Sequence, residues 1–126
     1  MPWVRCSGGA PSIKPVITQT YINSPYCSSA TSGYKLIFNI SNANISSNYS
    51  PRKMFSFQTD SPVDVVIANN IVGSGVRYEL QTSGGSVISS GNTATTVRVN
   101  SGEYTFWFYC TNSSSVSTGA NTVTIE

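Results

Sequence analysis

The chain has 126 residues, enough for one domain with a single modest core. Only 10% of the residues are charged and the net charge is +2, so the chain is neither strongly basic nor strongly acidic. Basic residues are scattered apart from Arg52-Lys53, which argues against a nucleic-acid partner. The sequence has no apolar run of about 18 residues, so we expect no transmembrane helix.

The polar part of the composition is uncharged. Ser, Thr and Asn together make up 46 of the 126 residues. A surface of hydroxyls and amides suits secretion, glycosylation or close lateral packing, because little charge is available to keep neighbouring molecules apart. Aromatic and β-branched residues are frequent, with 7 Tyr, 5 Phe and 2 Trp, and this excludes disorder for most of the chain. We therefore expect an extracellular, cell-surface or virion protein.

The N-terminal part reads as an extended arm, residues 1–22, preceding a domain at 23–126. Residues 1–12 have no periodicity, and a Thr-rich extended segment follows at 16–22. This segment is either the first strand of the domain itself or a donor strand that completes the open sheet of a neighbouring copy. The assembly interface expected from the donor-strand interpretation consists of Val16, Ile17, Thr18, Thr20, Tyr21, Ile22, Trp107 and Tyr109.

Further strands follow in chain order, separated by turn residues. We expect a loop at 23–33, a strand at 34–40, a long polar loop at 41–52, and strands beginning at 54, 63, 76, 87, 97, 104 and 122. In the strand at 76–81, Val76, Tyr78 and Leu80 alternate with Arg77, Glu79 and Gln81. No window keeps a helical period. The pattern predicts an all-β protein, a β-sandwich or jelly roll of about 8–9 short antiparallel strands.

The strand at 104–110 is unusual because both of its faces carry aromatic residues. Tyr104, Phe106 and Phe108 share one face, and Trp107 and Tyr109 share the other. Three interpretations of the second face are open. The strand is a central one whose second face is covered, or this face is a subunit interface, in which Trp and Tyr are enriched, or it is a sugar-stacking platform to which Tyr78 also contributes.

Three cysteines, Cys6, Cys27 and Cys110, are candidates for one disulfide with one thiol left over. A bond between Cys6 and Cys27 would hold the N-terminal segment, and a bond between Cys27 and Cys110 would join two strands. Spacing does not choose between them.

Four N-glycosylation sequons begin at Asn39, Asn44, Asn48 and Asn112. Three of them fall within ten residues of one predicted loop and its flank, whereas Asn39 lies in a predicted strand. We expect covalent N-glycans as partners of the chain, with Asn39 the poorest acceptor.

Catalytic groups are scarce in this sequence. It contains no His, which excludes Ser-His and Cys-His nucleophile systems, and only five carboxylates. Glu79 lies beside Arg77, and a structural role explains it without catalysis. That role is a cross-strand ion pair, for example with Arg98. We expect no enzymatic activity, no metal and no cofactor.

From residue 54 onward the pattern resembles a secreted β-domain family. The matching segments are Phe55-Ser-Phe57, 61–67, 78–88, 102–108 and 123–125. They resemble the Ser/Thr/Asn-rich β-domains of archaeal extracellular filaments and virus surface proteins, and also pre-peptidase-type jelly rolls. The resemblance to filament subunits implies donor-strand assembly and N-glycans.

The expected function is a structural subunit that assembles with copies of itself into an extracellular filament or a virus-like shell. A carbohydrate-binding module of a secreted protein, using Trp107, Tyr109 and Tyr78, is the alternative. An accessory domain of a larger secreted enzyme comes third.

Overall fold

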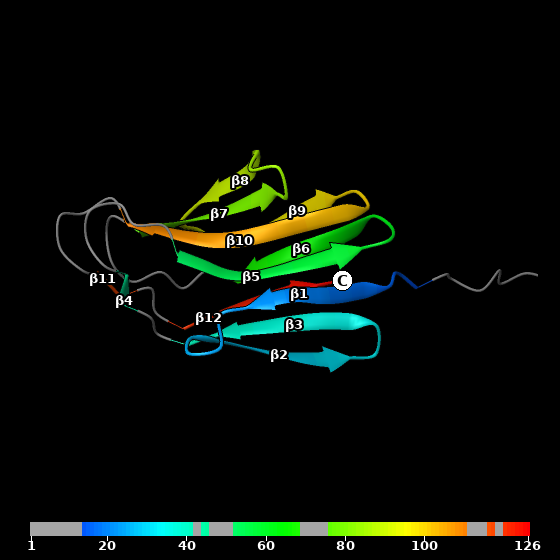
Figure 1. Cartoon of the computed structure of the whole chain (residues 1–126), viewed down its shortest axis with the longest axis horizontal. Helices are drawn as coiled ribbons and strands as arrows, with labels where there is room; N and C mark the ends of the chain where they lie inside the picture. The colour runs from blue at the N-terminus through cyan, green and yellow to red at the C-terminus, as the bar shows by residue number, and fades with distance from the viewer. Residues whose placement is uncertain (1–13, 42–43, 46–51, 69–75, 111–115, 118–119) are drawn as a thin grey trace, which may run out of the picture.

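The computed structural model describes residues 14–41, 44–45, 52–68, 76–110, 116–117 and 120–126. These residues form two five-stranded antiparallel sheets and a two-stranded ribbon, and helices are absent from this described part. Strands of both sheets run along the long axis of the molecule (Figure 1). The predicted all-β sandwich is confirmed.

The first sheet has the spatial order β1-β5-β10-β7-β8 and the second has the order β2-β3-β12-β6-β9. The strands of the first sheet are β1 (Ile17–Ile22), β5 (Arg52–Thr59), β10 (Gly102–Cys110), β7 (Val76–Thr82) and β8 (Val87–Gly91). Those of the second are β2 (Cys27–Ser32), β3 (Lys35–Ile40), β12 (Asn121–Ile125), β6 (Val63–Ala68) and β9 (Thr95–Val99). The ribbon pairs β4 (Asn44–Ile45) with β11 (Val116–Ser117). Within each sheet only β2–β3 and β7–β8 are consecutive neighbours, so the chain passes repeatedly between the two layers.

The core between the sheets is built around stacked aromatic rings. Phe38 of the second sheet stacks on Phe55 of the first with ring centroids 3.8 Å apart, and Phe55 stacks on Phe106 at 5.0 Å. Tyr78 extends the stack from Phe106 at 5.6 Å. These rings are buried, and each comes from the alternate positions of a strand, as a sheet with one buried face requires.

The predicted loop at 23–33 is wrong in its second half, where residues 27–32 form β2. Only Cys27 of this strand is buried, and the next five residues are exposed. The strand is therefore held by its backbone pairing with β3 rather than by a hydrophobic face. The hairpin closes through Gly33, whose φ of 62° lies in the left-handed region that favours glycine.

Residues 17–22 form an edge strand of the first sheet, paired antiparallel with β5 of the same chain. In the single chain this part of the predicted arm therefore belongs to the sandwich, which matches the first-strand interpretation. Residues 1–13 lie outside the described residues.

Candidate functional site

Strand β1 is attached to the sandwich mainly by its two ends. Ile17 and Ile22 are half-buried and pack against the core, whereas the four residues between them are exposed. Positions 17 and 22 would point to opposite faces of a regular strand, because side chains alternate. A bulge between Gln19 and Tyr21 shifts the register, so both isoleucines face inward. The side chains along β1 therefore do not alternate strictly between the two faces.

Polar contacts add to the attachment of β1. Thr20 Oγ1 and Ser56 Oγ are hydrogen-bonded at 2.6 Å. Just before the strand, the Val16 backbone N–H donates to Asp60 Oδ1 at 2.8 Å, and the Asp60 N–H donates to the Val16 carbonyl at 3.2 Å. These contacts fix the start of β1 against the turn between β5 and β6.

The exposed large apolar side chains gather at the edges of the first sheet. Among the described residues they are Val16 (62% exposed), Tyr21 (41%), Val87 (50%) and Ile88 (41%). Tyr21 lies in β1 and Val16 immediately precedes it, while Val87 and Ile88 lie in β8. Neither edge strand contains a charged residue or a proline. By contrast, the edge strand β9 of the second sheet carries Arg98, whose guanidinium lies 3.3 Å from Asp64.

Strand register places Tyr21 and Val87 in one row across the outer face of the first sheet. Tyr21 pairs with Ser56, which pairs with Thr105, and the row continues through Gln81 to Val87. The two exposed side chains therefore lie at opposite ends of the same row. A copy placed beside this one across the sheet would bring the Tyr21 side chain of one molecule next to the Val87 side chain of the other.

The outer face of β10 carries the two aromatic residues that the sequence analysis singled out. Trp107 and Tyr109 are both half-buried. The Trp107 indole N–H donates to Thr105 Oγ1 at 2.9 Å. The Arg77 guanidinium lies 5.3 Å from the centroid of the Tyr109 ring, within cation–π range. The second face of this strand is thus covered partly by its own neighbours.

A closed polar network joins this face to β7. Glu79, only 7% exposed, accepts from Arg77 Nη2 at 2.7 Å and from Gln81 Nε2 at 2.9 Å. Gln81 Nε2 also donates to the Tyr109 hydroxyl at 3.0 Å. The expected ion pair between Glu79 and Arg98 is wrong, because Glu79 pairs within its own strand. The network makes this face rigid rather than leaving polar groups free for a ligand.

Tyr78 is not part of that face. It is 2% exposed, lies in the core stack, and its hydroxyl is hydrogen-bonded to Ser89 Oγ at 2.9 Å. The expected place of Tyr78 in a sugar-stacking surface is therefore wrong, since Tyr78 faces the opposite side of the sheet. Sugar stacking on Trp107 and Tyr109 stays a prediction.

Cys27 is a free thiol in the structure and is buried at the start of β2. Both disulfides considered from the sequence use Cys27, so neither is present. Cys6 and the side chain of Cys110 lie outside the described residues. Burial raises the pKa of the Cys27 thiol to about 12, because desolvation disfavours the thiolate. This thiol is therefore protonated and a poor nucleophile at neutral pH.

One of the four predicted glycosylation sites can be placed. Asn39 is exposed on the outer face of β3, and its Oδ1 accepts from Thr122 Oγ1 at 3.3 Å. Asn44 lies in β4, but its side chain is outside the described set, as are Asn48 and Asn112. Glycosylation stays a prediction for all four.

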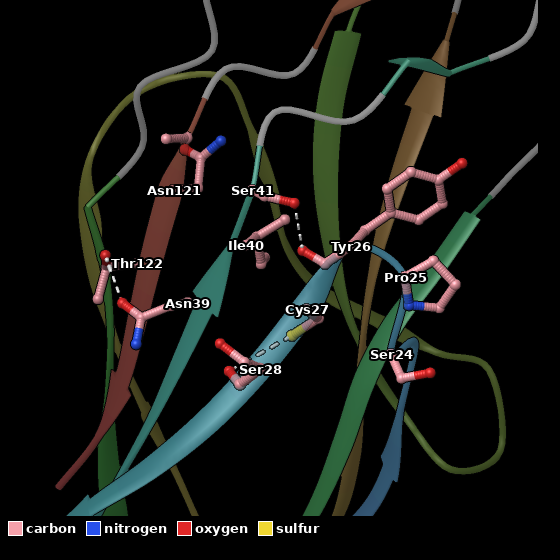
Figure 2. A pocket seen from close by; sticks show the side chains of 11 residues that line it. Ser24, Pro25, Tyr26, Cys27, Ser28, Asn39, Ile40, Ser41, Asn121 and Thr122 are labelled. Atoms are coloured by element: carbon pink, nitrogen blue, oxygen red, sulfur yellow. Dashed lines mark hydrogen bonds between the residues drawn. The ribbon is translucent and has the colours of Figure 1, made fainter.

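An open pocket of about 470 Å³ lies at one end of the second sheet. It is lined by the turn before β2, the end of β3 and the start of β12 (Figure 2). The lining residues are Ser24, Pro25, Tyr26, Cys27, Ser28, Asn39, Ile40, Ser41, Ala120, Asn121 and Thr122. Sequence reasoning missed this pocket, because its residues come from three separate segments, and Asn39 and Cys27 were noted only as a sequon and a disulfide candidate.

Among the described residues, no group of three His, Cys, Asp or Glu side chains is placed to hold a metal ion. The same part of the chain contains no helix long and apolar enough to span a membrane.

No protein-family model matches the chain, and no curated protein matches it. A solved structure, the glycosylation-associated protein (Gap123) complex from Streptococcus agalactiae, is similar at 12% sequence identity and a TM-score of 0.34. The similarity covers 89% of this chain and 26% of that chain. A TM-score this low relates neither the detailed fold nor the function of the two proteins.

Proposed function

We propose that this chain is a structural subunit that joins copies of itself head to tail through the two edges of its first sheet. The product would be an extracellular filament. If the rotation between successive copies brings the last copy back to the first, the product would be a closed shell. The observation that carries the proposal is the character of β1 and β8, which are uncharged edge strands bearing the exposed large apolar side chains.

Edge strands present unpaired backbone N–H and C=O groups that can pair with another chain. Natural monomers block such pairing with charged residues, prolines or bulges. Neither β1 nor β8 carries a charge or a proline, although each edge contains a bulge. Both edges of the first sheet thus lack two of the three usual protections.

The strand directions define how the edges would meet. Four antiparallel pairings separate β1 from β8, so these two strands run in the same direction. A copy displaced across the sheet would therefore pair its β1 in parallel with β8 of its neighbour. Such a contact joins two different surfaces, and repetition of a heterologous contact produces an open polymer.

The composition supports the extracellular setting. A surface in which hydroxyls and amides replace charge permits close lateral packing, because like-charge repulsion between subunits is small. The proposed role is non-catalytic. Exchange of β1 between copies would be a different assembly, in which β1 of one copy pairs with β5 of the next.

Charged edges test this proposal. Thr18→Lys/Tyr21→Ser places a charge on β1, and Val87→Lys/Ile88→Ser places one on β8. Each variant should yield monomers by size-exclusion chromatography and negative-stain electron microscopy under conditions where the unmodified chain polymerises. Thr96→Lys, on the exposed edge strand β9 of the second sheet, is the matched control and should leave polymers intact. Equal polymer from all four proteins would overturn the proposal.

A further inference from the structure

The pocket at the end of the second sheet has no role in the proposed edge contact, since none of its lining residues belongs to β1 or β8. Its volume of about 470 Å³ falls within the range of small-ligand sites. It opens where β3 ends and β12 begins, next to the turn that leads into β2. A ligand here would contact side chains fixed by strand ends on three sides.

The lining of the pocket is polar, and none of its described side chains is charged. Hydroxyls come from Ser24, Ser28, Ser41 and Thr122, and a carboxamide comes from Asn39, whereas the Asn121 side chain is buried beside Ile40. Both kinds of group donate and accept hydrogen bonds. A charged ligand would lose hydration here without gaining a counter-charge, so the lining favours an uncharged ligand rich in hydroxyl groups.

Several of these side chains are already oriented by bonds within the protein. Ser41 donates from both its N–H and its Oγ to the Tyr26 carbonyl, at 2.7 and 3.0 Å. The Tyr26 N–H donates to the Asn23 carbonyl at 3.0 Å, which closes the turn. The wall formed by this turn is therefore rigid, and binding would cost little ordering of the protein.

The carboxamide of Asn39 is oriented in the same way. Thr122 Oγ1 donates to Asn39 Oδ1 at 3.3 Å, which directs the amide nitrogen away from Thr122 (Figure 2). Its two N–H groups remain available as donors among the described residues. The Arg52 guanidinium lies 5.2 Å from the centroid of the Tyr26 ring, within cation–π range.

We infer that this pocket binds one ring of an uncharged sugar, such as the terminal hexose or N-acetylhexosamine of a glycan. Sugar hydroxyls match the mixed donor and acceptor lining, and the Tyr26 and Pro25 rings offer apolar surface to the C–H face of a pyranose. Binding is non-covalent, because the Cys27 thiol in the pocket wall is buried and hydrogen-bonded to the Ser28 carbonyl.

Ligand-observed NMR on the full chain tests this inference. The protein is made in a host without N-glycosylation, so that no sugar is attached at Asn39. The probes are the methyl glycosides of glucose, galactose, mannose and N-acetylglucosamine, with sialic acid and glucose 6-sulfate as charged comparisons. We expect at least one neutral glycoside to bind with a Kd on the order of 1 mM, as for small ligands with few contacts.

Paired variants locate the site. Asn39→Asp exchanges the amide donors for a negative charge at nearly constant shape and should weaken binding about tenfold, which corresponds to the loss of one good hydrogen bond. Asn92→Asp makes the same change on an exposed residue outside the pocket and should leave binding unchanged. Thermal unfolding of both variants shows whether they fold.

A second measurement keeps the inference testable if Asn39→Asp does not fold. In the unmodified chain, the side-chain amide signals of Asn39 should shift on titration with the neutral glycoside that binds. Absence of binding by every neutral glycoside, preference for a charged sugar, or shifts confined to other residues would overturn the inference. None of these results bears on edge assembly, which Val87→Lys/Ile88→Ser tests separately.

Discussion

The two sheets share one aromatic core but differ at their edges. In the first sheet both edge strands are uncharged and carry Tyr21, Val87 and Ile88 in exposed positions. In the second sheet β2 exposes small polar side chains, and β9 carries Arg98 paired with Asp64. Both layers pair antiparallel throughout, but the two edges of the first sheet contain bulges, whereas the described pairings of the second sheet keep a regular register. The difference teaches that the proposed association is to be expected at the edges of the first sheet.

Mixing the two variants that each carry one charged edge strand sharpens this comparison and should produce the largest effect. Thr18→Lys/Tyr21→Ser leaves β8 open, and Val87→Lys/Ile88→Ser leaves β1 open. If the contact is head to tail, each protein alone stays monomeric, and an equal mixture forms dimers that contain one copy of each. Light scattering after size exclusion measures the masses.

Dimers formed by either variant alone would contradict the head-to-tail contact. They would show that β1 pairs with β1, or β8 with β8, across a two-fold axis. The matched Thr96→Lys protein should behave like the unmodified chain in every mixture.

The polar groups of the two sheets should differ in their contribution to stability. Glu79 is almost fully buried and accepts charge-assisted hydrogen bonds, so Glu79→Ala should lower the free energy of unfolding by about 1–3 kcal/mol. The ion pair of Arg98 and Asp64 has side chains 64% and 40% exposed, and Asp64→Asn should cost about 1 kcal/mol or less. Urea unfolding compares the two variants. Equal losses would contradict the assigned difference in burial.

A smaller and pH-dependent effect should come from Cys27. Its pKa is raised from 9.0 to about 12 in the folded chain, so folding holds the thiol neutral. Its contribution is therefore complete below pH 9 and is lost as the pH rises toward 12, because the unfolded chain ionises first. Stability should therefore fall as the pH rises through this window, with a slope of at most roughly 1 kcal/mol per pH unit from this group alone.

Comparison with Cys27→Ala isolates the contribution of the thiol to the pH dependence of stability, because every other group that titrates at alkaline pH is present in both proteins. The unmodified chain should show the steeper decline in urea unfolding between pH 9 and pH 10. Parallel declines would show that Cys27 is accessible to solvent in the folded state.

Strands with a clear apolar alternation could be predicted from the sequence. Leu36, Phe38 and Ile40 are buried on one face of β3, within the strand predicted at 34–40, and the final strand begins one residue before the predicted position 122. Strand β2 could not be predicted, because five of its six side chains are exposed and its stability comes from backbone pairing. The bulge in β1 was also invisible, since it depends on where Ile17 and Ile22 meet the core.

The candidate sites were less accessible to sequence reasoning. Tyr78 is buried, as its alternation with polar neighbours between Val76 and Leu80 indicates. The same pattern shows that Tyr78 could not share a surface with Trp107. The pocket requires Tyr26, Asn39 and Thr122 to come together, and that depends on the pairing of β2, β3 and β12. No local pattern in one segment specifies such a pairing.

The most direct test of head-to-tail assembly is a disulfide between copies. Tyr21→Cys/Val87→Cys, with Cys6→Ser and Cys110→Ser, places thiols at opposite ends of one row, four strand spacings apart. At about 4.8 Å per spacing this exceeds the reach of a disulfide within one chain. Under mild oxidation the proposal predicts a ladder of disulfide-linked oligomers on a non-reducing gel, and none for Tyr21→Cys/Thr96→Cys in the same background. A single monomer band from Tyr21→Cys/Val87→Cys, or equal ladders from both proteins, would contradict it.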